Sequence, residues 1–213
     1  PIIIPLSNRS DREDVTAAIK RAQVDGVLIL YWHPESNILD VLRKEKLPYI
    51  LLNRSAPGCA AYVKSDLTKG AEMATKYLLE LGHRRIAYIG HCKKEQAMNV
   101  ERVAGYRKVI KEHGCSEIIK NPTDDSNQGI FELVDELMDE EPTPTGIICY
   151  TDILAVKVMA RLRKRGRSIP RDVSVIGFDD AVIASYCEPP LTTINLRAYE
   201  MAVLATNSLI DMV

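Results

Sequence analysis

The sequence predicts an α/β protein built from doubly wound parallel sheets, and three observations lead to that class. Short apolar runs of strand length alternate with segments of helical periodicity, at about 30 residues per strand–helix unit. Several runs are apolar throughout, which is typical of parallel strands covered by helices on both faces. The composition is that of a globular chain, with 46% hydrophobic and 27% charged residues.

Each apolar run is predicted to be a strand. The runs are Ile2–Pro5, Gly26–Leu30, Tyr49–Leu52, Arg85–Ile89, Glu117–Ile119, Ile147–Tyr150 and Val173–Phe178. Four intervening helices are predicted from apolar stripes and from end signals such as Asp66 as N-cap and Gly82, Gly114 and Gly166 beyond the C-termini. They cover Leu67–Leu81, Arg102–His113, a stripe from Ile130 to Met138, and a segment that begins at Asp152. Right-handed crossovers between such units wind a parallel sheet in both directions.

The length of 213 residues allows one large domain or two lobes of about 100 residues each. Residues 1–66 are expected to form an incomplete N-terminal lobe and residues 67–195 a C-terminal lobe. Residues 196–213 are expected to form a helix that returns towards the N-terminal lobe. The chain has no initiator Met and begins inside a predicted strand, so we expect a fragment without a DNA-binding domain.

Charge and cysteine content restrict the function. The formal net charge is −1, which offers no overall electrostatic attraction to nucleic acid. Five cysteines, an odd number without a C-x-x-C pair, indicate reduced thiols in the cytoplasm. No run approaches the roughly 20 apolar residues of a membrane span, and the N-terminus has no signal-peptide pattern, so no membrane partner is expected.

A ligand site is expected where the strands end, because open parallel sheets bind ligands beyond the carboxyl ends of their strands. The residues there are mostly hydrogen-bonding, with two aromatic side chains, which suits a polar, ring-shaped ligand. They are Asn8, Tyr31, Trp32, Asn53, Arg54, Gly90, His91, Thr151, Asp152, Asp179 and Asp180. Taken singly, each of them is equally explained as an ordinary loop or helix-cap residue.

Motifs for catalysis, cofactors and metals are absent from the sequence. It contains no G-x-S-x-G, G-x-G-x-x-G, G-x-x-x-x-G-K or H-E-x-x-H pattern. His91 and Cys92 are adjacent, but the other histidines are scattered and no zinc spacing is seen. Asp179 and Asp180 could form an acid–base pair, but no nucleophile or oxyanion device accompanies them. We therefore expect no enzyme, no cofactor and no metal.

Four motifs in matching order resemble the lactose-repressor (LacI/GalR) family of transcriptional regulators. LGHRRIAYIG at Leu81–Gly90 resembles the strand that opens the second lobe of that family. ERVAGYRKVIKEHG at Glu101–Gly114 is similar to its arginine-x-x-glycine-aromatic helix. The stretch Pro144–Asp180, ending in SIPRDVSVIGFDD, and PPLTTI at Pro189–Ile194 complete the pattern. The resemblance implies a two-lobed, periplasmic-binding-protein-like fold that is truncated here at both ends.

The resemblance also implies roles for four residues of the expected rim. Arg102 aligns with the family's effector-binding arginine, although a solvated helix residue would look the same in sequence. Asp179 aligns with an acidic effector contact on the opposite wall. Thr151 lies where many members have asparagine and is followed by Asp152, for which an N-cap role is the alternative.

Other expected effector contacts depart from the family or belong to the first lobe. Asp124 falls where several members place an aromatic side chain that stacks on the ligand, which weakens the case for purine stacking. Trp32 is expected to supply a stacking face from the first lobe, or else to pack in a core or interface. Asn53 and Tyr31 complete the set on that side.

The function implied is that of the effector-binding and dimerisation region of a LacI-type transcriptional repressor. A sugar, sugar phosphate or nucleobase is expected to close the two lobes and so regulate DNA binding. The expected partners are this effector, a second copy of the chain in a homodimer, and operator DNA held only through a helix-turn-helix domain absent from this chain. The alternative is a periplasmic-type solute-binding receptor for sugar uptake, against which the thiol-rich chain without a signal peptide argues.

Overall fold

A computed structural model describes residues 21–30, 38–56, 58–59, 61–93 and 96–213, together with residues 17 and 19. The chain divides into two compact units. Unit 1 comprises residues 1–65 and 197–213, and unit 2 comprises residues 66–196. The predicted strand Ile2–Pro5 lies outside the described residues.

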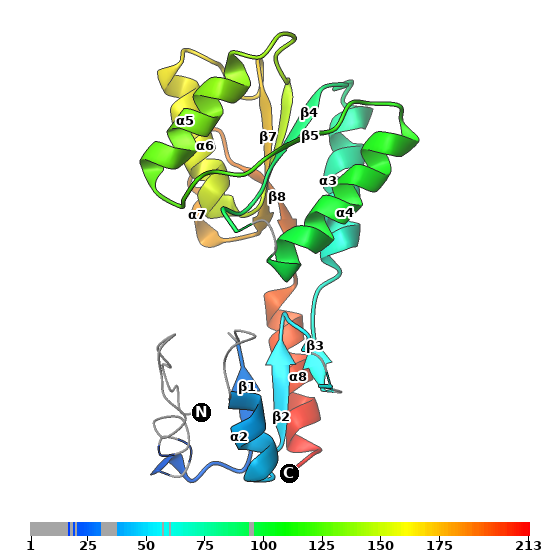
Figure 1. Cartoon of the computed structure of the whole chain (residues 1–213), viewed down its shortest axis with the longest axis vertical. Coiled ribbons are helices and arrows are strands. Elements are labelled where there is room, and N and C mark those ends of the chain that lie inside the picture. Colours follow the sequence, from blue (N-terminus) through cyan, green and yellow to red (C-terminus); the bar gives the residue numbers. More distant parts are fainter. Residues whose placement is uncertain are drawn as a thin grey trace. The chain divides into compact units, whose positions relative to one another are not determined.

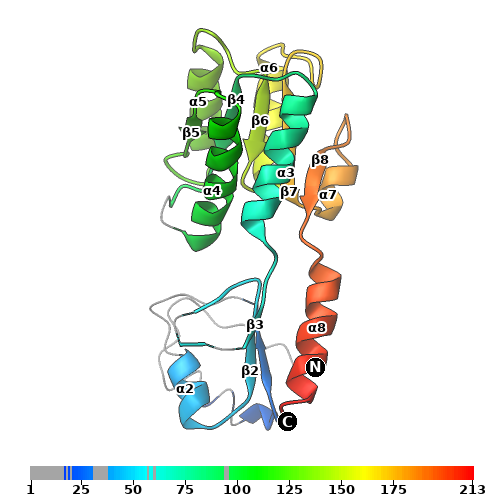
Figure 2. The same ribbon diagram turned by 90° about the vertical axis from the view of Figure 1, so that its right-hand side faces the viewer.

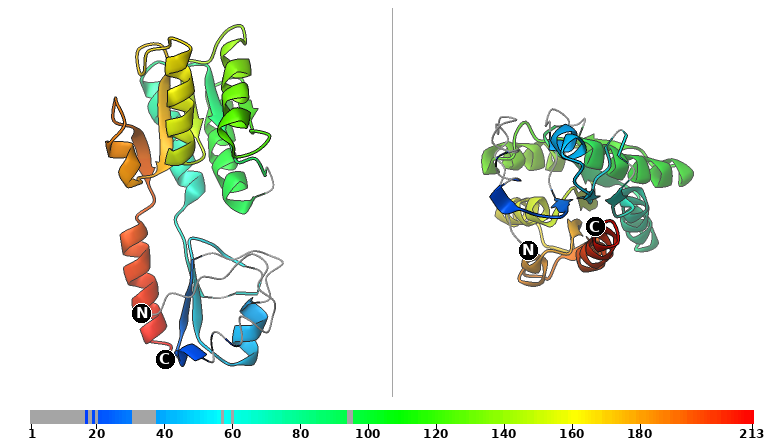
Figure 3. Two further views of the ribbon diagram at one scale, coloured as in Figure 1. Left: turned by 90° about the vertical axis from the view of Figure 1, so that its left-hand side faces the viewer. Right: turned by 90° about the horizontal axis from the view of Figure 1, so that it is seen from below.

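Unit 1 is a three-layer α/β structure. Its sheet consists of the parallel strands β1 (Val27–Ile29), β2 (Tyr49–Leu52) and β3 (Tyr62–Val63), in the order β1-β2-β3. Helix α2 (Ile38–Lys44) covers one face of the sheet and helix α8 (Ala198–Ile210) covers the other (Figures 2 and 3). The last helix of the chain therefore completes the unit that the first strands begin.

The central strand β2 explains why this sheet needs two covering helices. Leu51 packs in the cluster formed with α2, whereas Ile50 and Leu52 pack with Ala205 of α8. Successive side chains of a strand point to opposite faces. An apolar run without alternation therefore leaves an apolar surface on both faces, and each face must be covered.

Unit 2 contains a five-stranded, all-parallel sheet in the order β5-β4-β6-β7-β8. The strands are β4 (Ile86–Ile89), β5 (Ile118–Lys120), β6 (Gly146–Cys149), β7 (Ser174–Asp179) and β8 (Thr192–Asn195). The helices are α3 (Leu67–Glu80), α4 (Ala97–Glu112), α5 (Asn127–Met138), α6 (Asp152–Lys164) and α7 (Val182–Ser185). Neighbours in the sheet that are not consecutive in the chain, such as β4 and β6, show the doubly wound order predicted from the sequence.

Helices cover both faces of this sheet, with α3 and α4 on one side and α5 and α6 on the other (Figure 1). Strand β4 alternates between the two layers: Ile86 and Tyr88 pack towards α3 and α4, and Ala87 and Ile89 pack towards α5 and α6. All four side chains are fully buried. The fold class predicted from the sequence is thus confirmed.

The helix end signals are confirmed where they could be tested. The Asp66 side chain accepts a hydrogen bond from the Lys69 backbone N–H at 2.8 Å, as an N-cap does. Gly82, Gly114 and Gly166 follow three helices with φ of +94°, +64° and +74°, a conformation that favours glycine.

One sequence prediction about a helix start was wrong. Helix α4 begins at Ala97 rather than Arg102. The sequence does not mark this start, because the N-cap Gln96 makes no side-chain hydrogen bond and the first turns bury the polar residues Asn99 and Arg102 instead of an apolar stripe. Helix α6 begins at Asp152 as predicted, but its N-cap is Thr151, whose hydroxyl accepts from the Leu154 N–H at 3.2 Å, so the alternative of Asp152 as the cap is wrong. In addition, the short elements α2, β3, α7 and β8 were not predicted.

No helix in the described part of the chain is long and apolar enough to cross a membrane.

Candidate functional site

The candidate site is the edge of the unit 2 sheet at which its strands end. All five strands are parallel, so their carboxyl ends meet at one edge. We call this edge, with the residues that follow the strands there, the rim. It carries His91 after β4, the segment Tyr150–Asp152 after β6, Asp179 and Asp180 at the end of β7, and Asn195 at the end of β8.

Arg102 is the central residue of the rim. Its side chain is completely buried, and its guanidinium carbon lies 4.5 Å from the centre of the Tyr150 ring and 4.8 Å from that of the Phe178 ring. Its Nη1 donates to the Met98 carbonyl at 3.3 Å. Its Nε and Nη2 make no hydrogen bond within the described part of the chain. A buried guanidinium with unsatisfied N–H groups favours a further acceptor at this point.

Asp179 faces Arg102 across the rim, with Oδ1 3.6 Å from Nη2. The two groups form an ion pair, but the distance between these atoms exceeds the usual length of a charge-assisted hydrogen bond. Burial raises the pKa of Asp179 to about 6, against the opposing effect of Arg102 and with a further contribution from the Asp152 carboxylate. Its φ of +107° is unusual for a residue with a side chain. Backbone strain of this kind gathers at binding and catalytic sites, where the surrounding structure holds it in place.

Asp179 should give the stability of the chain a characteristic pH dependence. An acid whose pKa is raised in the folded state, here from 3.8 to about 6, stabilises the fold fully at low pH. That contribution is lost as pH rises through the folded pKa. We expect Asp179→Asn to lose less stability than the wild type between about pH 4 and pH 7. Urea unfolding at a series of pH values measures the difference.

The variant Glu132→Gln is the control for this experiment, because Glu132 is an exposed carboxylate on α5 and is not one of the groups that shift the pKa of Asp179. It should keep the pH dependence of the wild type. Parallel pH profiles for the wild type and Asp179→Asn would contradict the raised pKa of Asp179.

Thr151 and Asp152 lie on the rim but are engaged by the protein itself. The Thr151 hydroxyl caps α6. Asp152 is fully buried and accepts from the Ala181 N–H at 2.7 Å and from the Thr193 hydroxyl at 2.6 Å. It therefore ties the start of α6 to the loop after β7 and to β8. Gly177 leaves room for this tie, since an added Cβ there would lie 2.1 Å from Asp152 Oδ1.

Of the remaining expected contacts, one belongs to unit 2, one belongs to unit 1, and two fall outside the described residues. Asp124 is exposed and accepts from the Ser126 N–H at 2.8 Å, a local turn ahead of α5. Asn53 belongs to unit 1, directly after β2, where its φ is +56° and its Oδ1 is buried without a hydrogen bond among the described residues. Tyr31 and Trp32 lie outside the described residues.

Sequence reasoning missed Tyr150 and Phe178, which hold the guanidinium of Arg102 between them. Both residues end apolar runs that are predicted as strands, whereas the expected site contains only residues that follow the strands. Their signal was available, because an aromatic residue directly before the polar end of each strand places a ring beside the rim. The Tyr150 ring also contacts His91 edge-on, with ring centres 5.3 Å apart.

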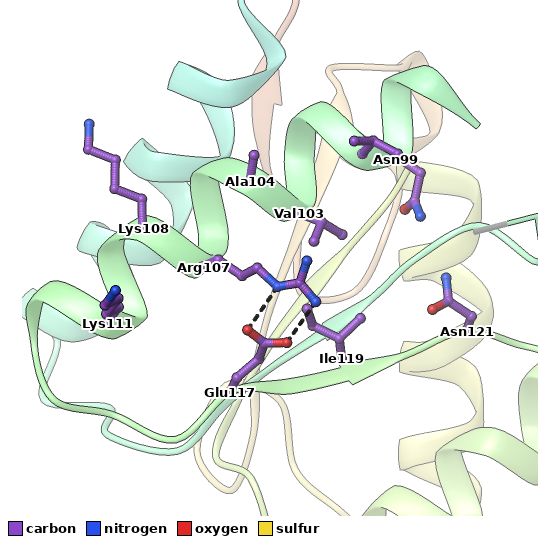
Figure 4. A pocket seen from close by; sticks show the side chains of 10 residues that line it. Asn99, Val103, Ala104, Arg107, Lys108, Lys111, Glu117, Ile119 and Asn121 are labelled. Carbon is purple, nitrogen blue, oxygen red and sulfur yellow. Dashed lines mark hydrogen bonds and ion pairs between the residues drawn. The ribbon is translucent and has the colours of Figure 1, made fainter. Parts of the chain in front are cut away.

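A separate groove runs along the outer side of α4 beside the edge strand β5 (Figure 4). Arg107 and Glu117 bridge it through two hydrogen bonds of 2.8 and 2.9 Å. Lys108, also on α4, is paired with Glu72 of α3 at 2.7 Å. Arg107, Glu117 and Lys108 are thus engaged by other side chains of the protein. At the rim, in contrast, Arg102 has N–H groups without a hydrogen bond among the described residues, so the rim remains the candidate site.

The fold and rim define a class of protein, the periplasmic-binding-protein-like α/β domains, and comparisons identify the family. The model of the periplasmic binding protein-like domain matches residues 75–213. The HTH-type transcriptional repressor PurR of Vibrio atlanticus is 32% identical over 196 residues, which cover 86% of this chain and 56% of that protein. The HTH-type transcriptional regulator CelR of Thermobifida fusca is 33% identical over 190 residues, covering 85% and 56%.

Solved structures give the same assignment. A regulatory protein of the LacI family from Chloroflexus aggregans superposes with a TM-score of 0.87 at 27% identity, covering 98% of this chain and 76% of that one. The structure described as a transcriptional regulator CelR–cellobiose complex has a TM-score of 0.78 at 29% identity, covering 94% and 64%. The chain belongs to the periplasmic binding protein-like domain family, as this domain occurs in LacI-type transcriptional regulators. It spans about half the length of the curated relatives it matches.

Proposed function

We propose that this chain is the effector-binding region of a LacI-type transcriptional repressor that acts in the cytoplasm. The observation that carries the proposal is Arg102, a fully buried arginine at the strand-end rim, two of whose nitrogen atoms make no hydrogen bond to the described residues. Such a group is costly unless an acceptor from a ligand completes it. The relatives are transcriptional regulators, so we assign ligand sensing rather than catalysis, and regulation rather than solute uptake, to this site.

The charges of the rim favour an uncharged effector. Three carboxyl groups lie near one another on the rim, since Asp152 raises the pKa of Asp179 and Asp180 contributes to the raised pKa of Asp152. Arg102 supplies the positive charge that pairs with Asp179 on this rim. A phosphate or carboxylate group would be repelled by this excess of negative charge. A sugar hydroxyl can accept from Arg102 and donate to Asp179, so both rim residues would be satisfied by one neutral group.

A nucleobase is supported less well than a sugar. The rings of Tyr150 and Phe178 already carry the guanidinium of Arg102, and Asp124 offers no ring for stacking. One structural relative is described as a complex with cellobiose, which is a neutral sugar. We therefore propose a neutral sugar as the effector.

The mechanism we propose is a ligand-driven closure of the two units. The chain passes between the units twice, after Ser65 and after Leu196. A ligand held by Arg102 and Asp179 of unit 2 would favour the closed state, provided that it binds this state more tightly. Closure would then change the spacing of helix-turn-helix domains outside these 213 residues, which must match operator half-sites about 34–36 Å apart.

We also propose that the regulator is a homodimer. Val182 and Tyr186 at α7 are 73% and 82% exposed, and Ile153 of α6, the helix against which α7 packs, is 53% exposed. An apolar group of this kind favours a protein partner. Analytical ultracentrifugation of the chain and of Tyr186→Ser tests this: a wild type that stays monomeric at all concentrations would contradict it.

A thermal-shift screen tests the effector class with matched pairs. Glucose is compared with glucose 6-phosphate to separate neutral sugars from anions. Cellobiose is compared with purine bases to separate sugars from nucleobases. At a hundredfold excess over Kd a ligand adds about 2.7 kcal/mol, which should raise the melting midpoint by roughly 5–10 °C for a domain of this size. A shift with the phosphate alone would contradict the charge argument, and a cooperative melt that no member of a broad sugar and purine panel shifts would contradict effector binding.

A further inference from the structure

A second cluster of side chains lies at the end of β4 and in the loop between β5 and α5, and its His91 contacts the Tyr150 ring. It consists of His91, Cys92 and Asp125, whose donor atoms all lie within 4.8 Å of one another. His91 Nε2 is 3.9 Å from Asp125 Oδ2, and Cys92 Sγ is 3.7 Å from His91 Nδ1. Asp125 follows Cys92 by 33 residues and comes from the loop between β5 and α5, which is why no ligand spacing is visible in the sequence.

Hydrogen bonds hold the two segments of the cluster in place. The Asn121 amide, at the start of the Asp125 loop, donates to the His91 carbonyl at 2.7 Å. On the other side of that loop, Lys157 of α6 donates to the Asp125 carbonyl at 2.8 Å. These two hydrogen bonds hold the backbone of both segments, and the Asp125 side chain, which is 70% exposed, lies beside His91. A pre-arranged backbone with adjustable side chains lowers the cost of gathering ligands around an ion.

The donor set fits a transition-metal cation of the zinc type. Zn²⁺ binds Cys sulfur at about 2.3 Å and His nitrogen or carboxylate oxygen at about 2.0–2.2 Å. Around a tetrahedral ion such bonds keep ligand atoms roughly 3.3–3.8 Å apart. The 3.9 Å between His91 Nε2 and Asp125 Oδ2 is close to this range, whereas Cys92 Sγ is 3.7 Å from Nδ1 and must turn, together with Asp125, to reach an ion at Nε2. A thiolate and an imidazole select zinc-like ions over Ca²⁺ and Mg²⁺, which prefer oxygen.

We propose that His91, Cys92 and Asp125 form a binding site for a divalent zinc-type cation, with a fourth position open to water. Binding through Nε2 moves the ring proton to Nδ1, so the hydrogen bond from the Lys93 N–H to Nδ1, 3.0 Å long here, is given up. The Cys92 thiol releases its proton to solvent as the metal–sulfur bond forms. The site lies on the same rim as the proposed effector site, since His91 contacts the Tyr150 ring that packs on Arg102, but it uses none of the residues proposed to hold the effector.

Cobalt(II) is the probe, because a thiolate bound to Co²⁺ gives a charge-transfer band in the near ultraviolet. The 213-residue chain is titrated with Co²⁺ under reducing conditions, and Zn²⁺ is then added. We expect one equivalent of Co²⁺ to develop the band and Zn²⁺ to abolish it. Cys92→Ser should lose the band, and Asp125→Asn should weaken binding by more than about tenfold.

The controls are a thiol and a carboxylate elsewhere in unit 2. Cys115→Ser removes a partly exposed thiol after α4, and Glu132→Gln removes an exposed carboxylate on α5. Both should bind Co²⁺ as the wild type does. A wild type without saturable binding, or a band that survives in Cys92→Ser or disappears in Cys115→Ser, would overturn the proposal. Thermal melts of the variants in chelator show that each is folded before it is titrated.

Discussion

We expect Arg102→Met to weaken effector binding by roughly 30- to 150-fold. The guanidinium is buried at the rim with Nε and Nη2 unsatisfied, so its N–H groups are the donors a neutral sugar would meet. Losing hydrogen bonds to a charged group costs about 2–3 kcal/mol, which corresponds to that change in Kd. Isothermal titration with the sugar that gives the thermal shift measures it.

Methionine is chosen because it separates binding from stability. It is unbranched and apolar, so it can fill the space between Tyr150 and Phe178 that the arginine side chain occupies. Removing Arg102 alone also leaves the Asp179 carboxylate, which is 37% exposed, without its ion-pair partner. We therefore compare the free energies of unfolding at about pH 5, where Asp179 is largely protonated in the folded chain, and expect Arg102→Met to stay there within about 1 kcal/mol of the wild type.

Arg107→Met is the matched control on the same helix. Arg107 is 56% exposed and pairs with Glu117, which is 44% exposed, so its loss should cost at most about 1 kcal/mol. It should leave effector affinity unchanged, because the pair lies in the groove beside β5 and not on the rim. Wild-type affinity in Arg102→Met would rule out the role we give Arg102.

The second large effect is expected at Gly105, one turn further along α4. A Cβ added to Gly105 would lie 2.1 Å from the Thr68 carbonyl oxygen and 3.0 Å from the Ala71 Cβ. Helices α3 and α4 are therefore packed with their backbones in close approach, and the obstacle is a backbone atom that cannot rotate away. We expect Gly105→Ala to lower the free energy of unfolding by about 3 kcal/mol, measured by urea denaturation.

The sign of this effect distinguishes packing from helix propensity. Alanine is favoured over glycine inside a helix by about 1 kcal/mol, so propensity alone predicts that Gly105→Ala stabilises the chain. Ala104→Ser, at the adjacent exposed position, is the control and should change the unfolding free energy by about 0.5 kcal/mol or less. A Gly105→Ala variant as stable as the wild type would mean that α3 and α4 separate without cost.

These two residues belong to one sequence motif, Arg102-Val103-Ala104-Gly105-Tyr106, and the structure gives a reason for each conspicuous position. Arg102 reaches the rim, and Gly105 lets α4 approach α3. Tyr106 is buried, and its hydroxyl donates to the Ile86 carbonyl at 2.7 Å and accepts from the Ile118 N–H at 2.9 Å. It thereby joins α4 to β4 and β5. The motif thus serves binding, helix packing and sheet attachment within five residues.

The layered fold could be predicted from the amino-acid order because its signals are local. Unalternating apolar runs such as that of β4 require cover on both faces, and Asp66 and Gly82 mark helix ends by interactions that span a few residues. The strand-end rule then selected Thr151, Asp152 and Asp179, because parallel strands share one carboxyl edge. Each of these inferences needs only the period of the sequence and the chemistry of a helix terminus.

What each rim residue does depended on contacts between segments far apart in the chain. Asp152 looked like an effector contact or an N-cap, but Thr193 and Ala181 occupy its oxygens. Tyr150 and Phe178 enclose Arg102 only because β6 and β7 lie side by side under α4. Asp125 meets His91 across 34 positions of sequence. Periodicity and capping act within a turn or a strand, whereas burial, ion pairing and ligand geometry arise only when the chain has folded back on itself.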